Sequence, residues 1–223
     1  AARADLRHLA AIFDRLPCPV YHVVGNHCLK EISRDELRKT LRMDADYYRV
    51  DLCEGWRLLV LDTTELSLHG RWPRTSRQNT EANEYYAAHK GEPRMQTYNG
   101  GAGRMQMDWL RAELAAAEMD NCRVLVASHH PTAHGSARET HRSWTGDEIA
   151  KACAESSAFM LGLSGHDHVG GYATHLGKPF VTLEAMLESD DETNAYGWLK
   201  LFPDRIEIEG RGNMTSRTFK LKK

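Results

Sequence analysis

Hydrophobic and polar positions alternate along the chain in two different periods. Apolar positions in residues 4–16 recur near helical spacing, which predicts an amphipathic helix that ends before Pro17. A second helix is predicted to begin near Arg34, because Ser33 and Glu36 form a capping-box pattern in front of it. The first part of the chain is therefore predicted to contain two helices.

Short apolar runs between the helical patterns predict strands. These runs are PVYHVV (19–24), YYRVDL, WRLLVLDT, RVLVAS, FMLGLS (159–164), PFVTLEA, YGWLKLF and RIEIEG. Long helical patterns also cover GRMQMDWLRAELAAAEMD and residues 147–156. Residues 65–103 and 131–145 lack periodicity and are predicted to be polar surface loops, and the C-terminal TSRTFKLKK a solvated tail.

Strands that alternate with helices and then follow one another predict the α/β class. A mixed sheet covered by helices is the expected architecture. No internal repeat or linker divides the chain, so residues 1–223 are expected to form one domain.

Metal-binding residue types follow three of the predicted strands. Residues 25–27 read Gly-Asn-His, residues 129–131 read His-His-Pro, and residues 165–168 read Gly-His-Asp-His. Sites in α/β sheets form where strands end at their carboxyl edge. If the three strands are parallel neighbours, these side chains are expected to meet in one crevice.

Imidazole nitrogens together with an amide oxygen indicate a borderline divalent ion such as Mn, Fe or Zn. An amide ligand is less usual for structural zinc and fits better in a two-metal hydrolytic site. The remaining histidines are interpreted as ordinary surface residues: His8, His22, His69, His89, His130, His134, His141 and His175.

The net charge and the cysteine content limit which partners and which cellular compartment are expected. The formal net charge of -2 gives no electrostatic case for nucleic acid or an anionic membrane. The five cysteines are scattered without a Cys-x-x-Cys pair, which favours a reducing compartment, and a cytoplasmic location is expected. No apolar run reaches the ~18 residues of a membrane span. The oligomeric state is left open.

The three motifs, in this order and after strands, resemble the last three motifs of the calcineurin-like metallophosphoesterases. The segments YNGGAGRMQMDWLRAEL, GHDHVGGY, VTLEAMLES and AYGWLKLFPDRIEIEGRG are similar to manganese-dependent ADP-ribose/CDP-alcohol diphosphatases. The resemblance implies a layered α/β/β/α sandwich that binds two divalent ions. Mn is the expected metal, ahead of Fe or Zn. It also implies a nucleotide substrate, such as ADP-ribose or a CDP-alcohol, cleaved by hydroxide attack on phosphorus.

Site residues follow from the same resemblance. Asn26, His129 and His166 would bind one metal ion, and His168 would help to bind the other. His27 would lie beside the phosphate as a charge stabiliser or proton donor. The resemblance assigns no substrate-binding residues, although the aromatic residues of the two long loops offer either stacking surfaces or loop anchors: Trp72, Tyr85, Tyr86, Tyr98 and Trp144.

The chain departs from the family pattern in its earlier motifs. No Asp-x-His occurs, and the single Gly-Asp, at residue 146, has Ala150 where a second Asp is required. Cys28 replaces the acid that usually follows Gly-Asn-His. The chain is therefore expected to lack the first strand–helix units, at least ~60 residues, and to be nearly inactive by itself.

Three other interpretations stay open from the sequence. The chain could bind a nucleotide without cleaving it, as a truncated pseudoenzyme. It could be an interaction domain with one metal ion or none. It could also be a phosphodiesterase from another branch of the same superfamily.

Overall fold

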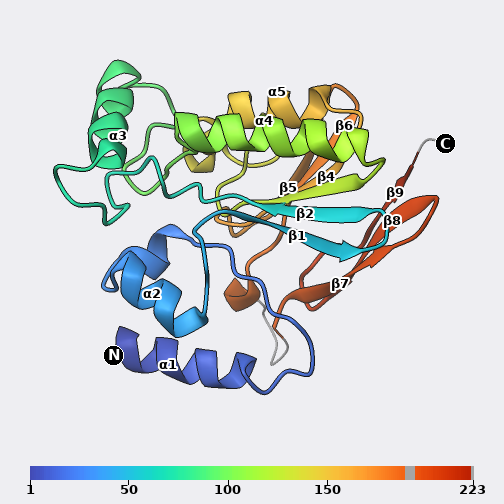
Figure 1. Cartoon of the computed structure of the whole chain (residues 1–223), viewed down its shortest axis with the longest axis horizontal. Coiled ribbons are helices and arrows are strands. Elements are labelled where there is room, and N and C mark those ends of the chain that lie inside the picture. The colour runs from blue at the N-terminus through green and yellow to red at the C-terminus, as the bar shows by residue number, and fades with distance from the viewer. Residues whose placement is uncertain (189–193, 222–223) are drawn as a thin grey trace.

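Two β-sheets pack face to face, and helices cover the outer face of the larger sheet (Figure 1). The computed structural model describes residues 1–188 and 194–221. The larger sheet has six strands in the order β1-β2-β3-β4-β6-β5, and the smaller has β7-β8-β9. The strands are β1 Tyr48–Cys53, β2 Trp56–Val60, β3 Arg123–Ala127, β4 Phe159–Ser164, β5 Gly171–His175, β6 Lys178–Thr182, β7 Tyr196–Leu201, β8 Arg205–Arg211 and β9 Arg217–Lys220.

Five α-helices and three 3-10 helices connect these strands. They are α1 Ala2–Phe13, η1 Asn26–Leu29, α2 Arg34–Leu41, α3 Arg77–Ala88, α4 Arg104–Met119, η2 Glu139–His141, α5 Gly146–Glu155 and η3 Met186–Glu188, all within the described residues. Among the described residues, none of these helices has the length and apolar content that a membrane crossing requires.

The six-stranded sheet is mixed, with a parallel centre. Strands β2, β3, β4 and β6 run parallel to one another, whereas the edge strands β1 and β5 pair antiparallel with β2 and β6. Parallel strands are usually buried on both faces. The carboxyl ends of β2, β3 and β4 therefore meet at one edge, as the sequence predicted for two of them.

Side chains of β3 alternate between two hydrophobic cores. Val124 and Val126 face α4 and α5, whereas Leu125 faces the smaller sheet. Ile206 and Ile208 of β8 close the second core from the other side. Both faces of the sheet are thereby removed from water at β3.

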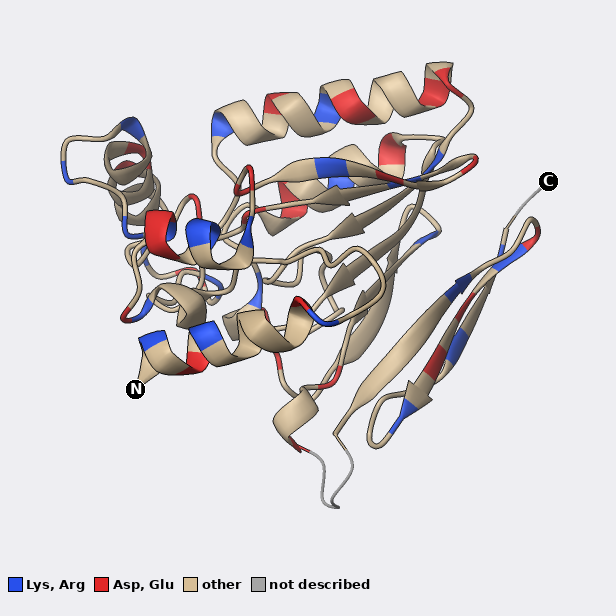
Figure 2. Cartoon of the chain, turned by 60° about the horizontal axis from the view of Figure 1, so that its bottom comes forward, with Lys and Arg blue, Asp and Glu red and all other residues tan. Residues whose placement is uncertain are grey.

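The fourth layer of the expected α/β/β/α sandwich does not appear in the described part of the chain. Helices α1 and α2 lie on the same side of the large sheet as the small sheet, but at its opposite end (Figures 1 and 2). They pack with η1 through Leu29 and Leu37. Strand β7 keeps Tyr196 and Trp198 exposed, so the described residues form three layers, α/β/β.

Most predicted elements are confirmed, and the capping box is formed as expected. The Ser33 hydroxyl accepts a hydrogen bond from the Glu36 backbone N–H at 3.2 Å. The predicted strand at residues 19–24 is wrong, because this extended segment joins no strand ladder among the described residues. Instead, the Tyr48 hydroxyl donates to the His22 carbonyl and accepts from its N–H, both at 2.8 Å. The Tyr48 side chain thus makes the backbone hydrogen bonds to His22 that a neighbouring strand would otherwise make.

The predicted polar loops are more ordered and more buried than their composition indicated. Helix α3 lies inside residues 65–103, with its Ala82 buried against Leu66, Met95 and Trp144. Helix α3 has too few apolar residues for its sequence to show a helical periodicity. Strand β5 also forms where the sequence predicts no strand.

The basic C-terminal segment contains a strand where a solvated tail was predicted. Strand β9 pairs antiparallel with β8, and Phe219 lies opposite Ile206 in the register. Residues 222–223 of the predicted tail, and Ser189 of the quoted VTLEAMLES segment, lie outside the described residues.

Replacing Ile206 with alanine is expected to destabilise the protein by about 2–5 kcal/mol, because its side chain is fully buried between the two sheets. The free energy of unfolding from denaturant titration measures the effect. Leu176→Ala is the matched control, since Leu176 is 68% exposed on the β5–β6 turn and should change stability by less than about 1 kcal/mol. Equal losses in both variants would contradict the packing between the sheets.

Candidate metal centre

The backbone ladder between β3 and β4 continues past the strand ends and places two histidines side by side. The Ser128 N–H donates to the Leu163 carbonyl, and the Gly165 N–H donates to the His129 carbonyl, each at 3.0 Å. Residues that follow two parallel strands in register leave the sheet at the same edge. His129 and His166 therefore face each other.

A glycine brings the third group to this edge. The segment before Gly25 runs close to the His129 ring, and a Cβ atom added to Gly25 would lie 2.8 Å from the ring atoms Nδ1 and Cε1. Only glycine permits this approach. Asn26, the first residue of η1, is thereby directed at His129 although residues 19–24 form no strand.

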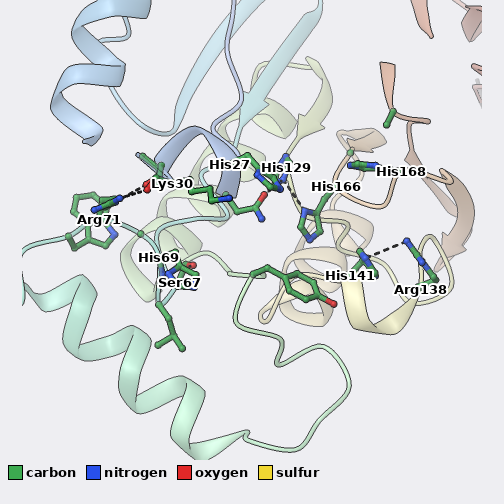
Figure 3. A pocket seen from close by; sticks show the side chains of 18 of the residues that line it. His27, Lys30, Ser67, His69, Arg71, His129, Arg138, His141, His166 and His168 are labelled. Atoms are coloured by element: carbon green, nitrogen blue, oxygen red, sulfur yellow. Dashed lines mark hydrogen bonds between the residues drawn. The ribbon is translucent and has the colours of Figure 1, made fainter. Parts of the chain in front are cut away.

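Three possible ligand atoms meet at the His129 ring, which Figure 3 shows beside His166. The His129 Nε2 atom lies 3.0 Å from Asn26 Oδ1 and 3.0 Å from His166 Nδ1. Neighbouring ligands of an octahedral ion at ~2.1 Å are also ~3.0 Å apart. Because His129 Nε2 carries one proton at most, it can donate to only one of its two neighbours. A cation at this point would satisfy all three.

Burial keeps these imidazoles neutral. Desolvation, with repulsion from neighbouring histidines, lowers the pKa of His129 to about 4 and the pKa of His166 to about 3. Neutral imidazoles and an amide oxygen fit a borderline divalent ion such as Mn, Fe or Zn. The residues present therefore suit the metal that the sequence predicted.

His166 has an unusual backbone conformation. Its φ of 67° lies in the left-handed region, which residues other than glycine rarely adopt. Strain of this kind clusters at binding sites, where the surrounding structure stabilises it.

All five residues predicted for the site line one pocket, and Asn26 and His166 each contact His129 directly. His27 and His168 lie on the wall of this pocket beside the Asn26–His129–His166 group. The His168 Nδ1 atom lies 2.8 Å from Glu188 Oε1, so its Nε2 is the nitrogen left for other partners.

His130 is buried in the protein interior, so its interpretation as a surface residue is wrong. The Thr63 hydroxyl lies 2.9 Å from His130 Nδ1 and accepts the His130 backbone N–H at 3.1 Å. The His130 Nε2 lies 3.3 Å from the Tyr98 carbonyl. Both ring nitrogens are thus occupied by protein atoms, so His130 supports the site and is not a ligand, although it lies near His129 and His166.

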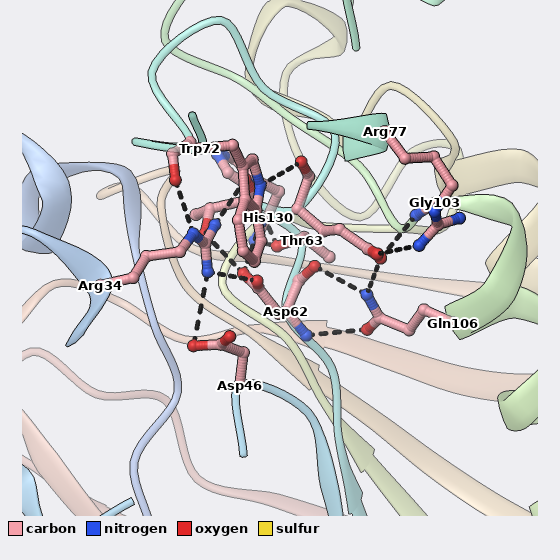
Figure 4. Close-up of polar contacts among 12 residues, drawn as sticks. Arg34, Asp46, Asp62, Thr63, Trp72, Arg77, Gly103, Gln106 and His130 are labelled. Atoms are coloured by element: carbon pink, nitrogen blue, oxygen red, sulfur yellow. Dashed lines mark hydrogen bonds and ion pairs between the residues drawn. The ribbon is translucent and has the colours of Figure 1, made fainter. Parts of the chain in front are cut away.

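A buried polar network surrounds Asp62 and His130, next to the site (Figure 4). Arg34 of α2 donates to Asp62 at 2.7 Å and to the Thr64 carbonyl at 2.9 Å, and its guanidinium lies over the Trp72 ring. These contacts join α2 to the end of β2 and to the loop that follows. Asp62 follows β2, as two of the histidine motifs follow β3 and β4, so the same strand-end pattern could have identified it.

A second ion pair draws the 131–145 loop over the pocket. Asp167, which is 1% exposed, accepts the Arg138 backbone N–H at 2.8 Å and the guanidinium at 2.6 Å. Burial by itself would raise the pKa of Asp167, but the Arg138 hydrogen bonds hold that pKa below its ordinary value. His141 of this loop consequently lines the pocket.

The cavity in front of the histidines has a volume of about 1520 Å³. The basic residues Lys30, Arg71 and Arg74, together with His69, also line this cavity. Of the five aromatic residues considered from sequence, Trp72 and Tyr98 line the cavity. The others pack in the interior as loop anchors: Tyr85, Tyr86 and Trp144.

Comparison with known proteins identifies the family. The profile of the calcineurin-like phosphoesterases matches residues 3–170, about three quarters of the chain. This chain belongs to the calcineurin-like phosphoesterase family. Its mixed α/β fold is the one seen in the crystal structure of a dimetal phosphatase from Danio rerio, with a TM-score of 0.91 and 26% identity. That match covers 99% of this phosphoesterase and 78% of the Danio rerio chain.

Similar curated proteins carry one shared name. A manganese-dependent ADP-ribose/CDP-alcohol diphosphatase from Arabidopsis thaliana is 31% identical over 97% of this phosphoesterase and 75% of its own length. A protein of the same name from Oryza sativa is 32% identical over 91% of this phosphoesterase and 68% of its own length. The resemblance stated from the motifs is thereby confirmed.

Gly25→Ala is expected to weaken Mn binding about 10–100-fold, because the new Cβ would displace the His129 ring. Gly165→Ala is the matched control, since a Cβ there meets no atom within 4 Å. Calorimetric titration of Mn into each variant measures the affinities. An affinity for Gly25→Ala equal to that of the parent would contradict the close approach at His129.

The metal-free phosphoesterase is expected to lose stability as the pH falls from about 7 to 5. The unfolded chain protonates His129 and His166 near pH ~6.5, whereas in the fold their pKa values are about 4 and about 3. The unfolded state therefore binds more protons in this window, which costs up to ~1.4 kcal/mol per pH unit for each histidine.

Denaturant titrations at several pH values measure this slope. His134→Asn should keep it, because the His134 side chain is 78% exposed, and His129→Asn should reduce it. A stability that does not change between pH 7 and 5 would contradict the burial of neutral imidazoles.

Proposed function

We propose that this phosphoesterase is a metal-dependent hydrolase of nucleoside diphosphate-linked substrates, with ADP-ribose and CDP-alcohols as the substrate class. The convergence of Asn26 Oδ1, His129 Nε2 and His166 Nδ1 on the floor of a large cavity carries the proposal. The shared name of the similar curated proteins supports the choice of substrate and of Mn.

Each of these residues has a proposed task at the metal centre. Asn26, His129 and His166 hold one divalent ion, and His168 contributes to a second, with Mn preferred over Fe or Zn. Divalent ions supply activation of water and neutralisation of phosphate charge in such sites.

The side chains around the metal centre orient the substrate and move protons. His27 lies next to Asn26 on the pocket wall, where it stabilises the charge that develops on the phosphate or donates a proton to the leaving oxygen. Lys30 and Arg74, which also line the cavity, attract an anionic nucleotide. A cavity of about 1520 Å³ accommodates a dinucleotide-sized molecule.

Binding without hydrolysis is the second candidate function. The histidine group found among the described residues contains no carboxylate. In two-metal sites a bridging carboxylate offsets the mutual repulsion of the ions. With neutral ligands alone the phosphoesterase would retain one ion and a bound nucleotide but would cleave it slowly.

A cytoplasmic location is part of the proposal. The five cysteines are all unpaired, which suits a reducing compartment. Burial raises the pKa of the Cys153 thiol, so this cysteine is expected to be unreactive.

His166→Ala is expected to lose most of its bound Mn, together with all of the turnover of ADP-ribose to AMP and ribose 5-phosphate that the Mn-loaded parent protein shows. Loss of one of three converging ligands leaves two neutral donors, which cannot compete with water for the ion. Chromatography of the products and elemental analysis measure turnover and metal content.

His175→Ala provides the control, because His175 ends strand β5 and does not line the cavity. Equal Mn content in His166→Ala and the parent would refute the metal assignment. Binding of ADP-ribose without turnover of ADP-ribose, CDP-choline or cyclic ADP-ribose would favour the second candidate function.

A further inference from the structure

Asn99 is a buried residue that touches the metal centre from outside the three histidine motifs. Its exposed fraction is 0%. Its side-chain Nδ2 donates to the Arg94 carbonyl at 2.8 Å and to the Thr140 carbonyl at 2.9 Å. Its Oδ1 lies 2.8 Å from the Nε2 atom of His166.

These partners fix which way the Asn99 amide points. Carbonyl oxygens only accept hydrogen bonds, so the NH₂ end must face the Arg94 and Thr140 carbonyls. The oxygen then faces His166, and it can only accept. The proton of a neutral His166 ring is therefore placed on Nε2, and Nδ1 keeps its lone pair.

We propose that Asn99 is a positioning residue that sets the tautomer of His166 and so makes Nδ1 its metal-binding atom. The proposal rests on the metal centre described above. The His166 Nδ1 is the atom that lies 3.0 Å from His129 Nε2, on the side of the ring away from Asn99. The hydrogen bond between His166 Nε2 and Asn99 thus leaves Nδ1 as the nitrogen available to a cation.

The surroundings of Asn99 keep it in place. Its backbone carbonyl accepts a hydrogen bond from the Ser67 hydroxyl at 3.2 Å, and its backbone N–H donates to the Gln96 carbonyl at 3.1 Å. The His166 ring is flanked by the rings of Tyr98 and His130, with centroids 5.9 and 4.4 Å away. Rotating the ring by half a turn would remove Nε2 from Asn99 and leave the buried Asn99 oxygen without this donor, which is unfavourable.

Outer partners of metal-binding histidines typically change metal affinity about 10–100-fold. Without the Asn99 acceptor, the His166 proton can move to Nδ1, where it must leave before a metal binds. Asn99→Ala is therefore expected to populate both tautomers and to weaken Mn binding by about 10–100-fold.

The test uses the metal-free protein labelled with ¹⁵N-histidine. Imidazole ¹⁵N shifts distinguish the two tautomers, and the parent is expected to show His166 protonated on Nε2 alone. Asn99→Asp removes the same two amide donors as Asn99→Ala but keeps an acceptor facing His166. It should therefore retain the Nε2–H signature, even if both variants are equally destabilised.

Ser143→Ala is the matched control. It deletes a buried hydrogen bond to the adjacent Gly100 carbonyl, at 2.9 Å, without touching the Asn99 side chain. It should leave both the His166 signal and the Mn affinity as in the parent.

Two results would overturn the proposal. A parent spectrum with the His166 proton on Nδ1 does so whether or not any variant folds. A folded Asn99→Ala protein with the parent tautomer and the parent Mn affinity also does so. Because the tautomer is read without metal or substrate, a failure of the proposed hydrolysis leaves this test intact.

Discussion

The position of the His129 ring is the constraint on which the rest of the site depends. Its backbone carbonyl accepts from Gly165 and so sets the register with β4, while its ring leaves room for no side chain at Gly25. Its Nε2 then lies 3.0 Å from both Asn26 and His166. A shift of this one ring would separate all three ligand atoms, because each neighbour is placed against it.

Keeping buried imidazoles neutral and oriented requires polar partners in the surrounding shell. His130 is satisfied by Thr63 and the Tyr98 carbonyl, and His166 by Asn99. Buried polar groups without such partners destabilise a fold, whereas a satisfied network specifies one arrangement. The Arg34–Asp62 pair, which is almost fully buried, extends the same network to α2.

The cavity is made by segments that look like loops in the sequence. The loop that carries Arg138 is drawn over the histidines by Asp167, and the loop that follows β2 is joined to α2 through Arg34. Both segments bury residues of their own, such as Trp144 and Leu66. Loops on a rigid sheet edge can thus present a basic wall to a nucleotide while the ligands stay on the strand ends.

The sequence by itself determined the α/β class, most of the helices and strands, the three motifs and the family they belong to. These features are encoded locally, in periodicity and in a few adjacent residues. Only the tertiary structure decided that residues 19–24 form no strand, that His130 is internal, and that Asn99 contacts His166. The Thr63–His130 and Asn99–His166 contacts each join residues 67 positions apart, so no local pattern could predict them.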